Sequence, residues 1–345
     1  MMKTKWGVLG SGGIARRRTI PEGITKADNA GLFAMYDVNP AAVQEIARIF
    51  GGLACASEQE LLKSECDVVY VATPVHLHCA QVVRAAEGGK HVFCEKPLGL
   101  TVEEAERMVT ACRRNNVKFG VGFMMRFHAQ HQEALRLIRA GKIGTPVLAR
   151  AQLSCWYPPI EGAWRQDPST GGGGSLVDMG CHCIDLLEMF FGQVQRVLCL
   201  TGNLVHRYRS EDTAVALLEF KNGAKGVVDN LFNVPDESSK NRLELYGSCG
   251  SILAEGTIGQ GELGEMVARI QESAKDYSAQ QVRDLGAGER ITPQPVNMYR
   301  AEVEAFSRAV LDDTDPPVGA DLGLWSQKVL AACYQSAATG KAVSP

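Results

Sequence analysis

The stretch Gly10-Ser11-Gly12-Gly13-Ile14-Ala15 follows an apolar run over 5–10 and indicates the fold of residues 1–122. In a Gly-x-Gly-x-x-Ala turn between a strand and a helix, the first glycine permits a tight turn. The second lets backbone approach a pyrophosphate, and the small alanine lets the helix lie close to the strand. Asp37 ends the next strand 22 residues after Ala15, where a carboxylate can accept hydrogen bonds from both ribose hydroxyls. The pattern predicts a dinucleotide-binding βαβ unit; the alternative is a glycine-rich turn with a coincidental aspartate.

Strand and helix patterns alternate over the first 122 residues. Short runs of apolar, often β-branched residues predict strands over 5–10, 31–37, 67–73, 91–94 and 118–122. Apolar residues at helical spacing predict helices over 41–50, 78–88 and 101–115. Thr101 and Glu104 have the spacing of a capping box at the start of the last of these helices. This alternation predicts an α/β fold whose N-terminal Rossmann domain, residues 1–122, has a parallel sheet.

The pattern changes after Gly122 and predicts a second domain over 123–345. A helix is expected over 130–140, strands from Pro146, two hairpins at 214–231 and 242–254, and helices over 298–311 and 321–338. This order predicts an α+β domain with a large, mostly antiparallel, open-faced sheet. The sequence leaves open which domain the last two helices pack on. The uncovered face of such a sheet suits a partner subunit, so we expect a homodimer or homotetramer.

Composition excludes several function classes. The chain has 345 residues, 45% of them apolar, a formal net charge of −3 and no cluster of basic and aromatic residues, so nucleic acid is not an expected partner. No apolar run approaches the roughly 18 residues of a membrane span, and we expect a soluble, cytoplasmic protein. The eleven cysteines are scattered and form no Cys-x-x-Cys pair, which predicts free thiols. On a helix Cys181 and Cys183 point about 200° apart, so no metal site is expected.

Two short segments carry residues suited to the oxidation of an alcohol. Glu95-Lys96-Pro97 follows the strand predicted over 91–94, and Asp178 and His182 lie on a predicted helix. Oxidation of a secondary alcohol requires a base for the hydroxyl proton and a cation for the developing alkoxide. His182 suits the first task and Lys96 the second. Asp178, His182 and Asp185 lie at i, i+4 and i+7, so both carboxylates can flank the imidazole.

Each of these residues also has a purely structural interpretation. Ser175 and Asp178 have the spacing of a capping box, so Asp178 could serve only the start of its helix. Lys96 could be a surface lysine in a turn, and His182 a core histidine bonded to Asp185. The joint spacing of the three residues favours the catalytic interpretation.

Asp37 also indicates which cofactor is used. A carboxylate at this position repels a 2′-phosphate, and the following Val38 and Asn39 provide no cation to bind one. The run Arg16-Arg17-Arg18 on the first helix is the opposing observation, since it could reach a phosphate. We therefore expect NAD as the cofactor, with NADP as the alternative.

In order and spacing, the motifs of this chain resemble those of the glucose-fructose oxidoreductase/inositol dehydrogenase/rhizopine catabolism (Gfo/Idh/MocA) family. They are the Gly10 turn, Asp37, Ala72-Thr73-Pro74 with His76, Glu95-Lys96-Pro97, and the segment from Gly173 to Asp185. The resemblance spans the whole chain. It implies hydride transfer between NAD(P) and a secondary alcohol or ketone of a sugar, inositol or related polyol. It also implies that Lys96 and His182 lie beside nicotinamide and substrate, and that Asp178 holds the histidine or a neighbouring hydroxyl.

The motifs and the resemblance together define a candidate site. The catalytic candidates are Lys96, Asp178 and His182. The cofactor-binding candidates are Gly10, Ser11, Gly12, Gly13, Ile14, Asp37, Thr73, Pro74, His76, Glu95 and Lys96. The substrate-binding candidates are Arg126, Trp164, Arg165, Asp178 and His182.

The choice of substrate residues rests on the mix of aromatic faces and hydrogen-bonding groups around Trp164, which suits a polyhydroxylated ring; a self-packed loop is the alternative. Two other functions stay open from the sequence. One is an NAD-dependent glycosidase, in which transient oxidation enables elimination. The other is a non-catalytic, dinucleotide-sensing regulator.

Overall fold

The computed structural model describes residues 2–239, 241–271 and 287–345, and these divide into two compact units. The first unit contains Met1–Met124, Glu161–Gly173 and Asn297–Ala331. The second contains Met125–Ile160, Gly174–Val296 and Ala332–Pro345. The first break lies two residues beyond the predicted border at 122, but the first unit also takes in two later segments that the prediction assigned to the second domain.

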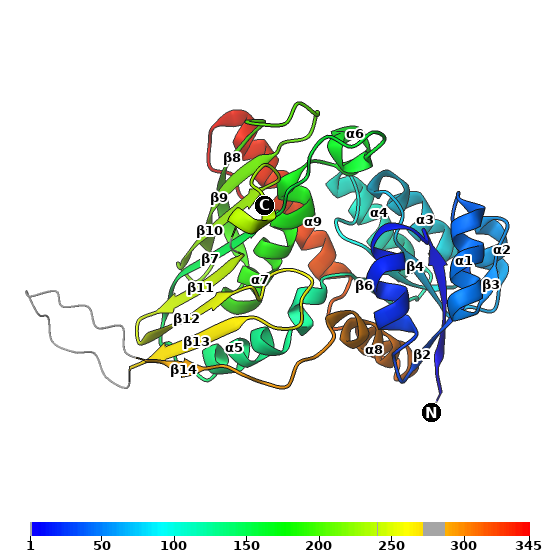
Figure 1. Cartoon of the computed structure of the whole chain (residues 1–345), viewed down its shortest axis with the longest axis horizontal. Coiled ribbons are helices and arrows are strands. Elements are labelled where there is room, and N and C mark those ends of the chain that lie inside the picture. The colour runs from blue at the N-terminus through cyan, green and yellow to red at the C-terminus, as the bar shows by residue number, and fades with distance from the viewer. Residues whose placement is uncertain (1, 240, 272–286) are drawn as a thin grey trace, which may run out of the picture. The chain divides into compact units, whose positions relative to one another are not determined.

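The first unit is built on a parallel sheet of six strands in the order β3-β2-β1-β4-β5-β6. Figure 1 labels four of them, β2, β3, β4 and β6. Its strands are β1 (Thr4–Leu9), β2 (Ala30–Tyr36), β3 (Leu53–Ala54), β4 (Val68–Val71), β5 (His91–Cys94) and β6 (Phe119–Val121). All neighbouring strands pair in parallel, which confirms the predicted Rossmann sheet. Two-residue β3 was not predicted, because two residues give no periodicity.

The helices between these strands are η1 (Ala15–Ile24), α1 (Pro40–Phe50), α2 (Glu58–Lys63), α3 (Val75–Glu87) and α4 (Val102–Arg114). Side chains accept hydrogen bonds from the first N–H groups of α1, α2 and α4, whereas η1 and α3 begin without a side-chain cap bond. The Thr101 side chain accepts a hydrogen bond of 3.2 Å from the Glu104 N–H, and Glu104 in turn accepts one of 2.7 Å from the Leu100 N–H. The predicted cap of α4 is therefore confirmed, with the return bond one residue earlier than in a standard capping box.

Helix α8 (Met298–Leu311) belongs to the first unit, which settles a point that the sequence left open. Phe306 of α8 packs edge-on against Trp6, with ring centroids 5.9 Å apart, and lies 5.3 Å from the ring of Phe93. A side chain on Gly120 would place Cβ 2.5 Å from the Phe306 ring, so β6 can pass this helix only with glycine there. The aromatic core thus joins β1, β5, β6 and α8.

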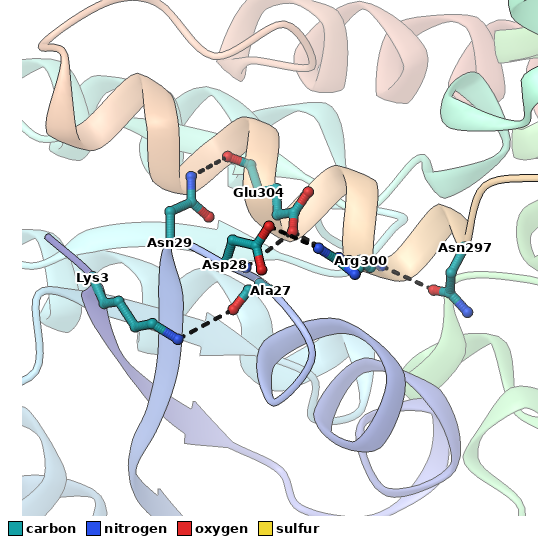
Figure 2. Close-up of polar contacts among 7 residues, drawn as sticks. All are labelled: Lys3, Ala27, Asp28, Asn29, Asn297, Arg300 and Glu304. Atoms are coloured by element: carbon teal, nitrogen blue, oxygen red, sulfur yellow. Dashed lines mark hydrogen bonds and ion pairs between the residues drawn. The ribbon is translucent and has the colours of Figure 1, made fainter. Parts of the chain in front are cut away.

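Polar contacts also fix α8 to the turn before β2 (Figure 2). The Glu304 side chain accepts hydrogen bonds from the Asp28 N–H at 3.0 Å and from Arg300 Nε at 2.7 Å. The Arg300 guanidinium also forms an ion pair with Asp28 at 3.0 Å, and the Asn29 side chain donates to the Glu304 carbonyl at 2.9 Å. Asn297 caps the helix by accepting from the Arg300 N–H at 3.0 Å.

The second unit contains an eight-stranded sheet in the order β14-β13-β12-β11-β7-β10-β9-β8. Its strands are β7 (Pro146–Ser154), β8 (Val194–Gly202), β9 (Thr213–Phe220), β10 (Lys225–Leu231), β11 (Arg242–Gly247), β12 (Gly250–Glu255), β13 (Glu265–Ile270) and β14 (Glu289–Arg290). The pair β7–β10 is parallel, and the other neighbouring pairs are antiparallel. The predicted mostly antiparallel sheet is confirmed.

Helices cover one face of this sheet, and α7 packs against β7 and β10. The longer helices are α5 (Ala129–Arg139), α7 (Cys181–Phe191) and α9 (Ala320–Thr339); α9 begins in the first unit and ends in the second. The short helical segments are η2 (Met124–Phe127), η3 (Trp164–Gln166), α6 (Pro168–Gly171), η4 (Leu176–Gly180) and η5 (Asp236–Ser238). On the other face apolar side chains are exposed, including Leu200 at 68% and Leu217 at 50%.

All eleven cysteines are free thiols, as the sequence predicts, and nine of them are buried. Burial raises the pKa of several, and that of Cys112 reaches about 12. Among the described helices, none is both long enough and apolar enough to cross a membrane.

Candidate active site

The glycine-rich turn lies between β1 and η1 in the first unit, as predicted. Gly10 has a φ of +89°, and a Cβ on it would lie 2.8 Å from the backbone of Ala72 and Thr73. Only glycine therefore allows the turn to pass the end of β4 at this distance. Around Gly13, with a φ of +45°, no atom lies within 4 Å of the Cβ position, so a bound group can approach the backbone there.

Asp37 follows β2 and its carboxylate is held against this turn. One oxygen accepts a hydrogen bond of 2.8 Å from the Ser11 N–H, and the other accepts one of 2.9 Å from the Asn39 N–H. The side chain is half-buried, so acceptor capacity on both oxygens stays available to a ribose. The structure thus brings the predicted turn and the predicted carboxylate together in one unit.

The arginine run on η1 is engaged in local contacts. Arg16 forms an ion pair of 2.8 Å with Glu45, and Arg18 forms one of 2.7 Å with Glu22. The Nε of Arg17 donates to the Gly13 carbonyl at 3.2 Å. Because the three arginines have these local partners, the run is a weaker candidate for binding a 2′-phosphate.

The segment after β4 contains a residue that the sequence reasoning did not select. Pro74 precedes α3, and His76 is exposed in its first turn, with Nδ1 3.4 Å from the Thr170 carbonyl. His78, two residues further along α3, is buried: its Nε2 lies 2.8 Å from the Thr73 carbonyl and its Nδ1 3.1 Å from the Pro97 carbonyl. His78 therefore links the segments that follow β4 and β5.

The segment after β5 carries Glu95 and Lys96. The Glu95 carboxylate accepts a hydrogen bond of 2.6 Å from the Tyr70 hydroxyl, and that hydroxyl lies 3.0 Å from the hydroxyl of Thr19. Burial raises the pKa of Glu95, and burial together with the Glu95 charge raises the pKa of Glu302 well above its usual range. The carboxylate thus bonds inside the unit, which gives Glu95 a structural function that the sequence did not indicate.

Lys96 is half-buried in a bend directly after β5, and the Lys96–Pro97 peptide bond is cis. The bend places the lysine at the carboxyl end of the sheet, where doubly wound sheets bind their ligands. This end also carries the Gly10 turn, Asp37 and Thr73.

Trp164 and Arg165 also lie in the first unit, on η3. The Arg165 guanidinium lies over the Trp164 ring, 4.1 Å from its centroid. Its positive charge is among the influences that lower the pKa of Glu95 against the effect of burial. The two residues predicted for substrate therefore belong to the unit that carries the dinucleotide turn.

Asp178 and His182 lie in the second unit, on the continuous helical segment formed by η4 and α7, which we call the site helix. Ser175 has helical dihedral angles (φ −59°, ψ −34°) and its side chain forms no cap bond, so the Ser175 half of the capping box is not formed. His182 is 6% exposed, whereas Asp178 is half-buried. The helix widens to π-type hydrogen bonding over η4, a feature that a regular 3.6-residue period does not predict.

Asp185 has a different partner from the expected one. Its carboxylate accepts from the Nε of Arg126 at 2.8 Å, and an Nη of the same guanidinium donates to the Asp185 carbonyl at 3.3 Å. Burial raises the pKa of Asp185, while Arg126 opposes that shift. Asp185 thus anchors the site helix to η2, whereas the helical spacing predicts it beside the imidazole of His182. A substrate contact of Arg126 stays a prediction.

The family comparisons agree with this architecture. The sequence model of an oxidoreductase family with an NAD-binding Rossmann fold, GFO_IDH_MocA, matches residues 4–123. The model of the GFO/IDH/MocA C-terminal domain matches residues 131–253. The two matches cover the parallel sheet of the first unit and most strands of the second.

Individual relatives span most of the chain. A 1,5-anhydro-D-fructose reductase of Ensifer adhaerens is 28% identical, with 98% of this chain and 97% of the relative covered. A myo-inositol 2-dehydrogenase of Thermotoga maritima is 30% identical over 72% of this chain and 74% of the relative. The crystal structure of an aldose–aldose oxidoreductase from Caulobacter crescentus superimposes with a TM-score of 0.85 at 26% identity, covering 99% of this chain and 100% of that one. The chain therefore belongs to the Gfo/Idh/MocA family and is an NAD(P)-dependent oxidoreductase.

Proposed function

We propose that the chain transfers a hydride between NAD and a secondary alcohol, or the corresponding ketone, of a sugar, inositol or related polyol. The observation that carries the proposal is the similarity, over 98% and 72% of the chain, to enzymes named for such substrates, in a chain that has Lys96, Asp178 and His182. The NAD-dependent glycosidase and the non-catalytic sensor are not favoured by these relatives.

In this proposal His182 takes the hydroxyl proton as the hydride leaves for the nicotinamide. Its 6% exposure limits competition from water for the same proton. Lys96 stabilises the developing alkoxide, and Asp178, four residues before His182, orients the imidazole or a neighbouring hydroxyl. NAD, when bound, supplies the hydride acceptor.

The cofactor residues proposed are those of the glycine-rich turn and the strand ends of the first unit. Asp37 would accept from the adenosine ribose, and its charge supports NAD over NADP. Backbone of the turn over 10–14 would contact the diphosphate at the start of η1. For the substrate we propose Trp164 and Arg165, whose stacked faces suit a polyhydroxylated ring, with Arg126 as a further candidate.

The test is absorbance at 340 nm with NAD or NADP against inositols, aldoses, sugar acids and other alcohols. We expect net NADH formation with NAD on at least one polyol, and loss of turnover by about 100-fold or more in Lys96→Ala and His182→Ala. Lys90→Ala is the control for the lysine, because Lys90 lies at the opposite end of β5 and bonds the Ser64 and Cys66 carbonyls.

Cofactor affinity separates the catalytic roles from cofactor binding. Both catalytic variants should bind NADH, followed by its fluorescence, within a few-fold of the parent chain. NADH binding without net reduction of NAD on any substrate would contradict the proposal. Equal loss of NADH binding in both variants would contradict the assigned roles.

We also propose that the chain forms a homodimer or homotetramer through the uncovered face of the eight-stranded sheet, because apolar side chains such as Leu200 and Leu217 are exposed there. The absence of a disulfide among all eleven cysteines supports a reducing compartment, the cytoplasm, as the place of the reaction.

A further inference from the structure

Glu211 lies just before β9 and contacts the start of the site helix at three consecutive residues. One oxygen of its carboxylate accepts a hydrogen bond of 2.9 Å from the Gly174 N–H, and the other accepts one of 3.0 Å from the Leu176 N–H. Its backbone carbonyl accepts from the Ser175 N–H at 3.1 Å. A single buried residue thus satisfies three adjacent amides, in a chain segment 35 residues away from them.

These amides are the ones a helix leaves without partners at its start. The next bond of the segment is the first one inside the helix, from the Asp178 N–H to the Gly174 carbonyl at 2.9 Å. Contact is so close that a Cβ on Gly174 would lie 1.9 Å from the Glu211 carbonyl oxygen. The start of the helix therefore has one position relative to Glu211, and any other position leaves buried amides without acceptors.

The carboxylate itself is held in place from the other side. The hydroxyl of Tyr334, in the part of α9 that belongs to the second unit, donates to it at 2.9 Å. Further along the site helix, Gly180 lies against β10, where a Cβ would be 2.7 Å from Oδ1 of Asn230. Asp185 is bonded to Arg126 at 2.8 Å. The helix is thus fixed at its start, at Gly180 and at Asp185.

We propose that Glu211 is the positioning residue of the catalytic pair: its carboxylate fixes the start of the site helix and thereby the geometry of Asp178 and His182 toward the substrate. The proposal rests on the proposed function. It predicts a loss in the catalytic step, because a displacement of about 1 Å at reacting groups can cost on the order of 100-fold in rate. Cofactor affinity should not change, because Glu211 and the dinucleotide turn belong to different units.

The neighbouring Asp212 offers a matched control. It too is buried before β9, and its carboxylate accepts hydrogen bonds of 2.9, 2.9 and 2.8 Å from the N–H groups of Leu204, Val205 and His206. These amides belong to a loop of the second unit and not to the site helix. Asp212→Asn removes a comparable set of charge-assisted bonds and so reproduces the loss of stability without the proposed effect on the site.

The kinetic experiment compares Glu211→Gln, Glu211→Asp and Asp212→Asn in the full chain. In Glu211→Gln the new amide group faces a backbone N–H, donor against donor. We expect Glu211→Gln to lower kcat by about 10- to 100-fold and to keep NADH affinity within about twofold of the parent chain. The kcat of Glu211→Asp should lie between those of Glu211→Gln and the parent chain. Asp212→Asn should keep kcat within about threefold. An equal fall of kcat in Asp212→Asn and Glu211→Gln would overturn the proposal.

A second readout does not require a substrate. The chain has seven histidines, so the His182 resonance can be assigned in the NMR spectrum of ring-labelled protein with a His182→Asn variant. We expect Glu211→Gln to move the ring resonances of His182, and Asp212→Asn to move those of His206, whose backbone N–H is bonded to the Asp212 carboxylate. An unmoved His182 in folded Glu211→Gln would overturn the proposal, whether or not the substrate panel succeeds. If no substrate of the panel gives NADH formation, that result alone would contradict the proposed function and not the role of Glu211.

Discussion

His78 has a buried imidazole between two carbonyl oxygens, with Nε2 2.8 Å from that of Thr73 and Nδ1 3.1 Å from that of Pro97. A neutral imidazole can donate from only one nitrogen, and burial lowers the pKa of His78 against the pull of these carbonyls. One of the two contacts is therefore a hydrogen bond and the other is weaker. Either way the residue holds together the segments that carry Thr73 and Lys96.

Replacement of His78 by alanine should therefore loosen both segments. We expect the Kd for NAD to rise by about 5- to 20-fold, the equivalent of one lost hydrogen bond, and kcat to fall as well because Lys96 is one residue before Pro97. Isothermal titration with NAD measures the first effect. The control is His91→Asn, at the opposite end of β5, which should leave the Kd within about twofold; an unchanged Kd in His78→Ala would contradict the prediction.

Asp37 determines the cofactor preference in the proposed function. Its two oxygens accept from the Ser11 and Asn39 amides at 2.8 and 2.9 Å, which orients them for a ribose. Asp37→Ala should weaken NAD binding by about 10- to 100-fold, because two hydrogen bonds to a charged acceptor are lost. NADP binding should weaken far less, since the repulsion of its 2′-phosphate is removed. Titration of both cofactors checks this, and an equal loss for NAD and NADP would contradict it.

The residues found from sequence and those missed differ in the range of their contacts. Asp37 and Lys96 follow recognisable strands, so local pattern alone places them at the carboxyl end of the sheet. Glu211 has its partners 35 and 37 residues away, and nothing in the sequence around it indicates that contact. Asp185 has the spacing to meet His182 but bonds Arg126 instead, because helical spacing selects a face and not a partner.

At the scale of elements, α5 and the residue that caps its start provide a pair of buried histidines. The rings of His128 and His131 lie 4.6 Å apart, and His131 Nδ1 is 2.9 Å from the Met125 carbonyl. Burial, followed by the neighbouring His128, lowers the pKa of His131 to about 3. The packing of α5 thus depends on an uncharged imidazole.

This pair predicts a stability effect with a definite sign. Because the folded-state pKa of His131 is depressed, the unfolded chain binds a proton at a higher pH than the folded chain does. The contribution of neutral His131 to the free energy of unfolding is therefore fully present above about pH 6.5 and is lost as the pH falls toward 3. From pH 7 to pH 5 the free energy of unfolding of the parent chain should fall by roughly 2 kcal/mol because of His131, and His131→Gln should not show this part of the decrease. Urea unfolding at the two pH values measures the difference, with exposed His76→Gln as control. Parallel pH curves for parent and His131→Gln would contradict the prediction.

Element types were predictable to the extent that their signals were local. The parallel strands, the cap of α4 and the hairpins follow from periodicity and turn residues. The π-type widening at η4 was not predictable from local signals, because it accompanies close packing of Gly180 against Asn230 of β10 and of Gly174 against Glu211. Packing of this kind is decided by residues distant in sequence.

At the scale of the whole molecule, the division into units follows long-range packing. Residues 161–173 and 297–331 join the first unit although the chain has by then entered or crossed the second. For the later segment the cause is visible in the rings of Trp6, Phe93 and Phe306, which build one core from the two ends of the chain. Sequence patterns predict a domain border where the pattern changes along the chain. They do not show that a later segment packs on the earlier unit.

The outer face of the eight-stranded sheet gives the last prediction. Alternation along β9 leaves Val215 and Leu217 exposed at 37% and 50%, beside Leu198 and Leu200 of β8 at 38% and 68%. Apolar side chains on neighbouring strands form a patch whose exposure costs free energy in a monomer, at roughly 25 cal/mol per Å². A second copy that covers this face recovers that free energy.

The double variant Leu200→Asp, Leu217→Asp places charges in this patch and should convert the proposed dimer or tetramer to a monomer. Light scattering at micromolar concentration gives the mass, expected near 37.3 kDa for the monomer. Ile49→Asp is the control, because Ile49 is 53% exposed on α1 of the first unit, so its mass should equal that of the parent chain. NADH affinity should be kept in the double variant, because the dinucleotide turn belongs to the other unit. A monomeric parent chain, or a double variant that keeps the parent mass, would show that this face is not the interface.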